Sequence, residues 1–156
     1  MTTSGRDDGV MDTDTTTLTR TIDTHLAGYC EPDRARRLEL LTAAWQPDGQ
    51  LLDPPLDGQG VVSIAELVDA VLAHYPDHRF ERTTEVDEHH GVARYGWVLT
   101  APDGTPAVTG TDVVELGADG KLARVVGFFG ELVALDSGAL DPGELGPAAL
   151  DVGAAR

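Results

Sequence analysis

The sequence predicts an α+β fold in which a curved, mostly antiparallel sheet and three helices enclose an apolar pocket. Three observations predict it. Apolar residues recur at helical spacing in three segments of the first half of the chain. Alternating segments fill the second half, and the turn signals Pro102-Asp103-Gly104 and Ala118-Asp119-Gly120 separate them. Helices followed by an antiparallel meander form an α+β arrangement.

The length of 156 residues suits one domain. Residues 1–14 are mostly polar, and residues 136–156 are rich in Gly, Pro and Ala. Such segments bury little, so we expect a disordered N-terminal tail over 1–14 and a flexible C-terminal tail over 136–156. The domain itself is predicted to span residues 15–135.

The chain is acidic, with 11 Lys and Arg residues against 27 Asp and Glu residues and a formal net charge of −16. Nucleic acids and anionic membranes both attract basic surfaces, so neither is an expected partner. No apolar run reaches the roughly 20 residues of a membrane span, and the polar N-terminal residues do not resemble a signal peptide. We therefore expect a cytoplasmic location.

Metal and cofactor signals are weak. Cys30 is the only cysteine, which leaves no disulfide within the chain and no cysteine-based zinc site. His74 and His78 are four residues apart, but Tyr75-Pro76 interrupts the helix between them. His89-His90 precedes a glycine and is expected in a solvated turn. Since no Gly-rich phosphate loop follows a strand, we predict neither a metal nor a cofactor.

Three apolar stripes predict the helices. Their members are, in order, Leu18, Ile22, Leu26 and Tyr29; Leu38, Leu41 and Trp45; and Ile64, Leu67, Val68, Val71, Leu72 and Tyr75. His25 lies on the edge of the first stripe. The second helix opens with Glu31-Pro32-Asp33 and ends at Pro47-Asp48-Gly49. Ser63 and Glu66 have the spacing of a capping box, which predicts the start of the third helix.

Alternation predicts strands over residues 50–53, 79–87, 92–100, 107–116 and 122–129. Tyr95, Trp97 and Leu99 share one face of the strand over 92–100. Phe80 shares the inward face of its strand with Arg82, whose charge we place at the surface.

Asp112 is the position that does not fit this pattern. Its strand places it on one face with four small or apolar residues, namely Val108, Gly110, Val114 and Leu116. If that face meets the helices, the carboxyl group is buried among apolar groups, where the protonated form is favoured. A neutral carboxylic acid can donate a hydrogen bond to a developing oxyanion.

Two other interpretations of Asp112 remain open at this stage. The strand could face the other way, which would leave Asp112 in solvent and turn Thr111, Val113 and Glu115 inward. Alternatively, Asp112 could form an ion pair with an arginine, either Arg82 or Arg94. The alternation favours the inward orientation, because the opposite one buries another carboxylate and fewer apolar groups.

Asp53 is the second candidate carboxylate. It ends a short strand immediately before Pro54-Pro55, and strand ends often carry site residues. The alternative is an ordinary turn aspartate that caps a local N–H group.

Two stretches resemble a known superfamily. They are Trp45-Gln46-Pro47-Asp48-Gly49-Gln50-Leu51-Leu52-Asp53-Pro54 and the segment from Gly110-Thr111-Asp112 to Gly130-Glu131. Over roughly residues 17–132, the chain resembles the nuclear transport factor 2-like superfamily, and within it the SnoaL-like polyketide cyclases and the ketosteroid isomerases. The resemblance implies a cone-shaped roll. It marks the activity less well, because one fold hosts many functions.

The resemblance also implies roles for four residues. Asp53 matches the general base of ketosteroid isomerases, and Asp112 matches their protonated oxyanion-hole aspartate. The oxyanion-hole tyrosine of the first helix has no match, since His25 occupies its position and Tyr29 lies one turn later. The residues expected to wall the pocket are Trp45, Leu67, Val71, Phe80, Tyr95, Trp97, Val114, Val125 and Phe129.

We therefore expect a cofactor-independent isomerase, cyclase or lyase that acts by acid–base proton transfer on a small hydrophobic ketone or polyketide-like compound. One alternative is a non-catalytic module that binds a small molecule or dimerises. Another is water activation as in limonene-epoxide hydrolases, although Arg94-Tyr95-Gly96 lacks the Arg-x-Asp spacing of those enzymes. By analogy with relatives, we expect a homodimer.

Overall fold

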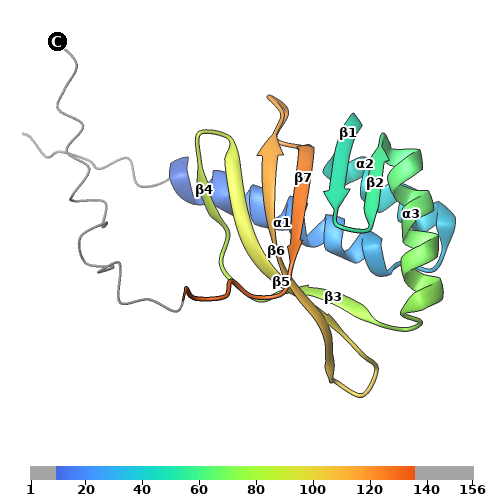
Figure 1. Cartoon of the computed structure of the whole chain (residues 1–156). Helices are drawn as coiled ribbons and strands as arrows, with labels where there is room; N and C mark the ends of the chain where they lie inside the picture. Colours follow the sequence, from blue (N-terminus) through green and yellow to red (C-terminus); the bar gives the residue numbers. More distant parts are fainter. Residues whose placement is uncertain (1–9, 136–156) are drawn as a thin grey trace, which may run out of the picture.

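Three helices pack against one face of a curved sheet in the computed structural model, which describes residues 10–135 (Figure 1). The helices are α1 (Val10–Cys30), α2 (Arg34–Ala44) and α3 (Val61–His74). The strands are β1 (Trp45–Asp53), β2 (Leu56–Gln59), β3 (Arg79–Arg82), β4 (Asp87–His89), β5 (Val92–Thr100), β6 (Pro106–Leu116) and β7 (Leu122–Phe129). The predicted α+β class and the three predicted helices are confirmed.

The seven strands form one sheet, in which six follow the order β2-β1-β7-β6-β5-β3. The seventh strand, β4, pairs with the first residues of β5, whereas β3 pairs with its last residues. Every neighbouring pair is antiparallel except β1 and β7, which are parallel. This pairing joins the early β-hairpin to the late meander. The core fills the space between the helices and the inner face of the sheet.

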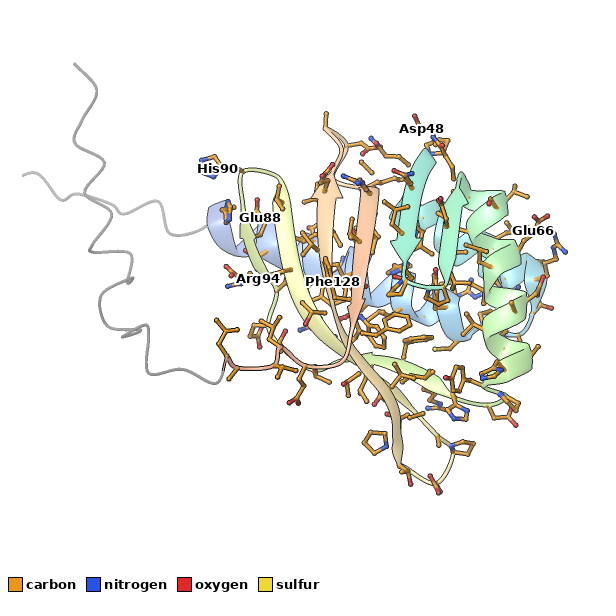
Figure 2. All side chains as sticks on the ribbon, in the orientation of Figure 1. Asp48, Glu66, Glu88, His90, Arg94 and Phe128 are labelled. Carbon is orange, nitrogen blue, oxygen red and sulfur yellow. The ribbon has the colours of Figure 1, made fainter. Side chains whose placement is uncertain are left out.

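The turn signals located the meander well. β5 and β7 have the predicted bounds, and β6 begins one residue earlier, at Pro106. The β4–β5 turn is also as expected, since His90 has a φ of 54°. Figure 2 shows Glu88, His90 and Arg94 projecting away from the body of the domain in this hairpin.

The prediction that Trp45 lies on the second helix is wrong. Trp45 ends α2 as its C-cap and is the first residue of β1, which is longer than the predicted strand. The Pro47-Asp48-Gly49 signal lies at a register shift within β1 rather than at the end of a helix. Gly49 is required there, because a Cβ at this position would lie 2.5 Å from the Trp45 ring.

The start of α3 also differs from the prediction. The helix begins at Val61, and no side chain caps its N-terminus, so the predicted Ser63–Glu66 capping box is wrong. Gly60 is the N-cap residue, with a φ of 84° that favours glycine. Its N–H donates to Gly49 O (2.8 Å), which joins the end of β2 to β1.

The strand predicted over residues 79–87 is two strands, β3 and β4, that both pair with β5. In the segment between them, Thr83 N donates to Gly96 O and Gly96 N donates to Thr84 Oγ1. The donor–acceptor distance is 2.8 Å in each bond. Arg82 forms an ion pair with Asp23 of α1 (2.9 Å), near the surface as expected.

A buried arginine fastens α2 to α3. Arg37 is 1% exposed and donates to three backbone oxygens and one carboxylate. Its acceptors are Glu31 O, Pro32 O, Ala65 O and Asp69 Oδ1. We call these residues the Arg37 cluster. Nothing in the sequence pattern had singled it out.

At the N-terminal side, α1 begins at Val10, so residues 10–14 of the predicted tail are helical. The rest of that tail and the predicted C-terminal tail over 136–156 lie outside the described residues. Within the described part of the chain, no helix is both long and apolar enough to span a membrane.

Candidate active site

A cavity of about 440 Å³ lies between the helices and the inner face of the sheet. Its lining is mostly apolar or aromatic, and none of the described residues that line it is Lys or Arg. They are His25, Leu26, Tyr29, Leu51, Asp53, Pro55, Leu56, Ala70, Val71, His74, Tyr75, Phe80, Trp97, Leu99, Val108, Asp112 and Phe129. All four predicted catalytic residues line this cavity. We call His25, Tyr29, Asp53 and Asp112 the polar cluster.

The sheet places the two carboxyl groups side by side. Asp112 of β6 pairs with Gly127 of β7, and Leu52 of β1 pairs with Val126. Asp53 and Gly127 are the next residues along their strands, so Asp53, Gly127 and Asp112 form a row across three strands.

Gly127 makes the approach of the carboxyl groups possible. A Cβ at this position would overlap Asp53 Oδ1 and lie 3.1 Å from Asp112 Oδ1. Both carboxyl groups therefore occupy the space that a side chain at residue 127 would need.

Both oxygens of Asp112 accept hydrogen bonds from β5. Tyr95 Oη donates to Oδ2 (2.8 Å), and Trp97 Nε1 donates to Oδ1 (2.7 Å). Tyr95 lies directly opposite Asp112 in the β5–β6 register. Trp97 reaches Asp112 across Gly110, where a Cβ would overlap the indole ring. The inward orientation of Asp112, with 5% exposure, is confirmed.

Burial raises the pKa values of both carboxyl groups, and hydrogen bonds oppose this shift at Asp112. Burial raises the pKa of Asp112 to about 6, while the bonds from Tyr95 and Trp97 oppose the shift. Burial and then the charge of Asp112 raise the pKa of Asp53 to about 7. The two carboxyl groups titrate as a pair, and the hydrogen bonds from Tyr95 and Trp97 favour the ionised form of Asp112. The family resemblance implied a protonated Asp112, whereas its two hydrogen-bond donors favour a carboxylate.

The other two members of the polar cluster come from α1. The Tyr29 hydroxyl is buried and has no hydrogen-bond partner among the described residues. Burial, and then Asp53 and Asp112, raise its pKa well above 10, so it remains a hydroxyl donor. His25 packs edge-on against Tyr29 with ring centroids 5.0 Å apart, and burial lowers its pKa to about 3.

Of the nine residues predicted to wall the pocket, four line the cavity and five do not. Val71, Phe80, Trp97 and Phe129 line the cavity, whereas Trp45, Leu67, Tyr95, Val114 and Val125 do not. Trp45 and Tyr95 lie behind the lining and hydrogen-bond to His25 and Asp112. Val114 and Val125 are core residues, and Leu67 packs against that core beside Gly58.

Sequence reasoning missed part of the lining, including Pro55, Leu56 and Ala70. Pro55 and Leu56 follow Asp53 at the turn into β2, a strand that the pattern did not reveal. Sequence reasoning also missed that Tyr95 and Trp97 donate hydrogen bonds to Asp112. Because the predicted hairpin places these residues and Asp112 on the same face of neighbouring strands, the pattern could have indicated this contact.

Neither arginine considered as a partner of Asp112 contacts it. Arg82 pairs with Asp23, and the exposed Arg94 pairs with Asp87 (2.9 Å each). The ion-pair interpretation of Asp112 is therefore wrong. Among residues 10–135, the arrangement therefore does not reproduce the arginine and two aspartates of the limonene-epoxide hydrolases.

No family model matches the chain, and no curated protein matches it. Among solved structures, the chain is similar to a SnoaL-like family protein from Agrobacterium tumefaciens that is provisionally named an isomerase. The two share 34% sequence identity, with 76% of this chain and 99% of the other covered and a TM-score of 0.68.

Two further structures are provisionally named polyketide cyclases. The one from Sinorhizobium meliloti is 19% identical, with 73% of this chain and 98% of the other covered and a TM-score of 0.57. A SnoaL-like one from Jannaschia is 13% identical, with 80% and 91% covered and a TM-score of 0.59. At these identities the likeness concerns the fold.

Proposed function

Because the chain belongs to the SnoaL-like family, we propose that it is an enzyme that moves a proton on a small hydrophobic ketone or polyketide-like compound. It would act as an isomerase, cyclase or lyase that needs no cofactor. The observation that carries this proposal is the pair of carboxyl groups over Gly127, at one side of an otherwise apolar cavity.

Asp53 is the proposed general base. It removes a proton from the carbon next to the carbonyl group and returns that proton to another position. A pKa of about 7 suits both steps, because a general base works best when its pKa lies near the working pH. Asp53 has no recorded hydrogen bond to another described residue, so its oxygens are available to a ligand.

Asp112 has a different proposed role. Tyr95 and Trp97 already donate to its two oxygens, which stabilises the ionised form. In addition to burial, the charge of Asp112 raises the pKa of Asp53 and so makes Asp53 a stronger base. Asp112 therefore tunes the base instead of donating a proton to the substrate oxygen.

The substrate oxygen is proposed to bind at Tyr29. The unpartnered hydroxyl group can donate to a carbonyl oxygen and to the enolate that forms when Asp53 takes the proton. The surrounding aromatic side chains would pack against the hydrophobic body of the substrate. Phe80 and Trp97 are examples, with ring centroids 5.4 Å apart.

Hydrogen–deuterium exchange tests this function without knowledge of the natural substrate. We would incubate 2-tetralone with the protein in D₂O buffer and follow loss of its α-proton signals by NMR. Asp53→Asn should slow the protein-dependent exchange by about 100-fold or more, since general base catalysis contributes about that much. Asp112→Asn should move the rising limb of the pH–rate profile to lower pH, because the pKa of Asp53 falls.

Asp57→Asn, which changes an exposed carboxylate of the neighbouring strand β2, is the matched control and should leave exchange unchanged. Binding of 2-tetralone without any exchange would support the non-catalytic binding module instead. Full exchange by Asp53→Asn would overturn the proposed base.

A further inference from the structure

We infer that Trp45 is a positioning residue that fixes His25 as a neutral hydrogen-bond donor, whose Nε2–H group binds an oxygen atom of an uncharged ligand. The inference rests on the proposed use of this cavity, and it specifies which chemical class of ligand the cavity accepts. Its first part concerns the ring of His25 alone and can be tested without any ligand.

The bond between Trp45 and His25 determines where the imidazole proton lies. Trp45 Nε1 lies 3.0 Å from His25 Nδ1, and both side chains are buried. An indole N–H group can only donate, so Nδ1 must offer a lone pair. In a neutral imidazole the proton is then on Nε2. A second proton on Nδ1 would face the indole N–H and break the bond.

The surroundings also hold the ring neutral. His25 is 3% exposed, and burial disfavours its charged form. The titratable groups that line the cavity with it are Tyr29 of the same helix, Asp53 of β1, Asp112 of β6, and His74 and Tyr75 at the end of α3. The carboxylates do not accept a hydrogen bond from His25 in the structure. The ring therefore acts as a donor and does not carry protons in the reaction.

The Nε2 atom is available for a ligand. It forms no hydrogen bond with residues 15–135, and His25 itself lines the cavity, whereas Trp45 lies behind it. Tyr29 follows one helical turn later and brings a second unpartnered donor. A carbonyl oxygen has two lone pairs and can accept from both groups.

The same arrangement indicates which ligands are rejected. Two carboxyl groups line the cavity, and no lysine or arginine in the described part of the chain lines it to balance the charge of an anionic ligand. A buried carboxylate without a partner is costly. The ligand class is therefore an uncharged hydrophobic compound with an acceptor oxygen, and not a carboxylate or a phosphate ester.

Long-range proton–nitrogen NMR of the free protein tests the tautomer. We expect His25 to carry its proton on Nε2 and none on Nδ1 from pH 5 to pH 8. Trp45→Phe keeps an aromatic ring but removes the donor, so signals of the Nδ1–H or doubly protonated form should appear. Phe128→Leu changes an exposed aromatic side chain that does not line the cavity, so it should leave the His25 spectrum unchanged. A proton on Nδ1 in the unchanged protein would overturn the inference.

Binding of matched probes tests the ligand part. The probes are 2-acetylnaphthalene, its hydrocarbon analogue 2-isopropenylnaphthalene, and 2-naphthoate. Trp45→Phe should weaken binding of the ketone by about 2- to 10-fold, the usual range for one hydrogen bond, and should not change binding of the hydrocarbon. The unchanged protein should bind 2-naphthoate at least tenfold more weakly than the ketone at pH 8.

Equal binding of ketone and carboxylate, or equal weakening of ketone and hydrocarbon, would overturn the ligand class. If Trp45→Phe does not fold, the unchanged protein still decides the outcome, because addition of the ketone should shift the His25 Nε2 signal. These results are independent of turnover, so they distinguish failure of this inference from failure of the proposed proton transfer.

Discussion

The Arg37 cluster and the polar cluster of the cavity both bury polar side chains, but they differ in how completely those side chains are hydrogen-bonded. Arg37 reaches four acceptors around it. In the polar cluster, Tyr29 Oη has no partner among the described residues, and Asp53 has no recorded hydrogen bond. A satisfied buried group stabilises the fold, whereas an unsatisfied one costs stability unless a ligand completes it. The comparison separates a structural site from a binding site.

The largest expected loss of stability comes from Arg37→Met. This change leaves the backbone acceptors of the Arg37 cluster unsatisfied, so it should lower the free energy of unfolding by roughly 2–4 kcal/mol. Urea denaturation measures this difference. Arg36→Met is the control, because Arg36 is exposed and pairs only with the exposed Glu39. Its effect should stay within about 0.5 kcal/mol. Similar losses for Arg37→Met and Arg36→Met would show that the buried hydrogen bonds of Arg37 do not stabilise the fold, and the contrast between the two clusters would then fail.

Asp53→Asn should have the opposite effect in a defined pH range. The pKa of Asp53 is raised to about 7 in the folded chain, so the folded state holds its proton more tightly than the unfolded state. The stability from this group is complete below pH 4 and is lost as the pH rises to 7. The variant avoids that loss.

Relative to the unchanged protein, Asp53→Asn should therefore be more stable by roughly 1–3 kcal/mol at pH 8 and about equal at pH 4, after a discount for partial exposure. Denaturation at the two pH values gives the comparison. Asp57→Asn should show no such pH-dependent gain. A variant that is less stable at pH 8 would contradict the raised pKa.

The smallest expected effects distinguish two tyrosines. Tyr95→Phe removes the donor to Asp112 Oδ2 and should cost about 1–2 kcal/mol. Tyr29→Phe removes a hydroxyl that has no partner in the described structure, so stability should stay within about 0.5 kcal/mol or rise. Thermal unfolding of both variants at one pH is sufficient. A larger loss for Tyr29→Phe would show that its hydroxyl is satisfied in solution.

Much of the fold was predictable, because local signals determined it. The turns before β6 and β7 fixed the strand ends, and the apolar stripes fixed the faces of the helices. The errors lie where a distant contact overrides the local pattern. Trp45 has helical spacing with Leu41, yet its ring packs over Gly49 within β1. The capping box at Ser63 was wrong because the contact between Gly60 and Gly49 sets the start of α3.

The candidate site was predictable in its members but not in its protonation. Asp53 and Asp112 were found from a strand end and from a break in the apolar pattern, and their proton-transfer roles stay predictions. Which carboxyl group ionises first depends on the donors Tyr95 and Trp97 and on clearance at Gly127. These distances are set by the packing of β1, β5, β6 and β7 against one another. No single segment of the sequence contains that information.

The parallel pairing of β1 with β7 has a consequence for the order of folding. The two strands are distant in the sequence, while β5, β6 and β7 form a local meander joined by short turns. Distant pairings carry a larger loop-closure cost, so we expect the meander to form before β1 joins it. Asp112 and Tyr95 would then meet early, and Asp53 would arrive last. A newly made chain would hold its proposed base apart from Asp112 until the sheet is complete.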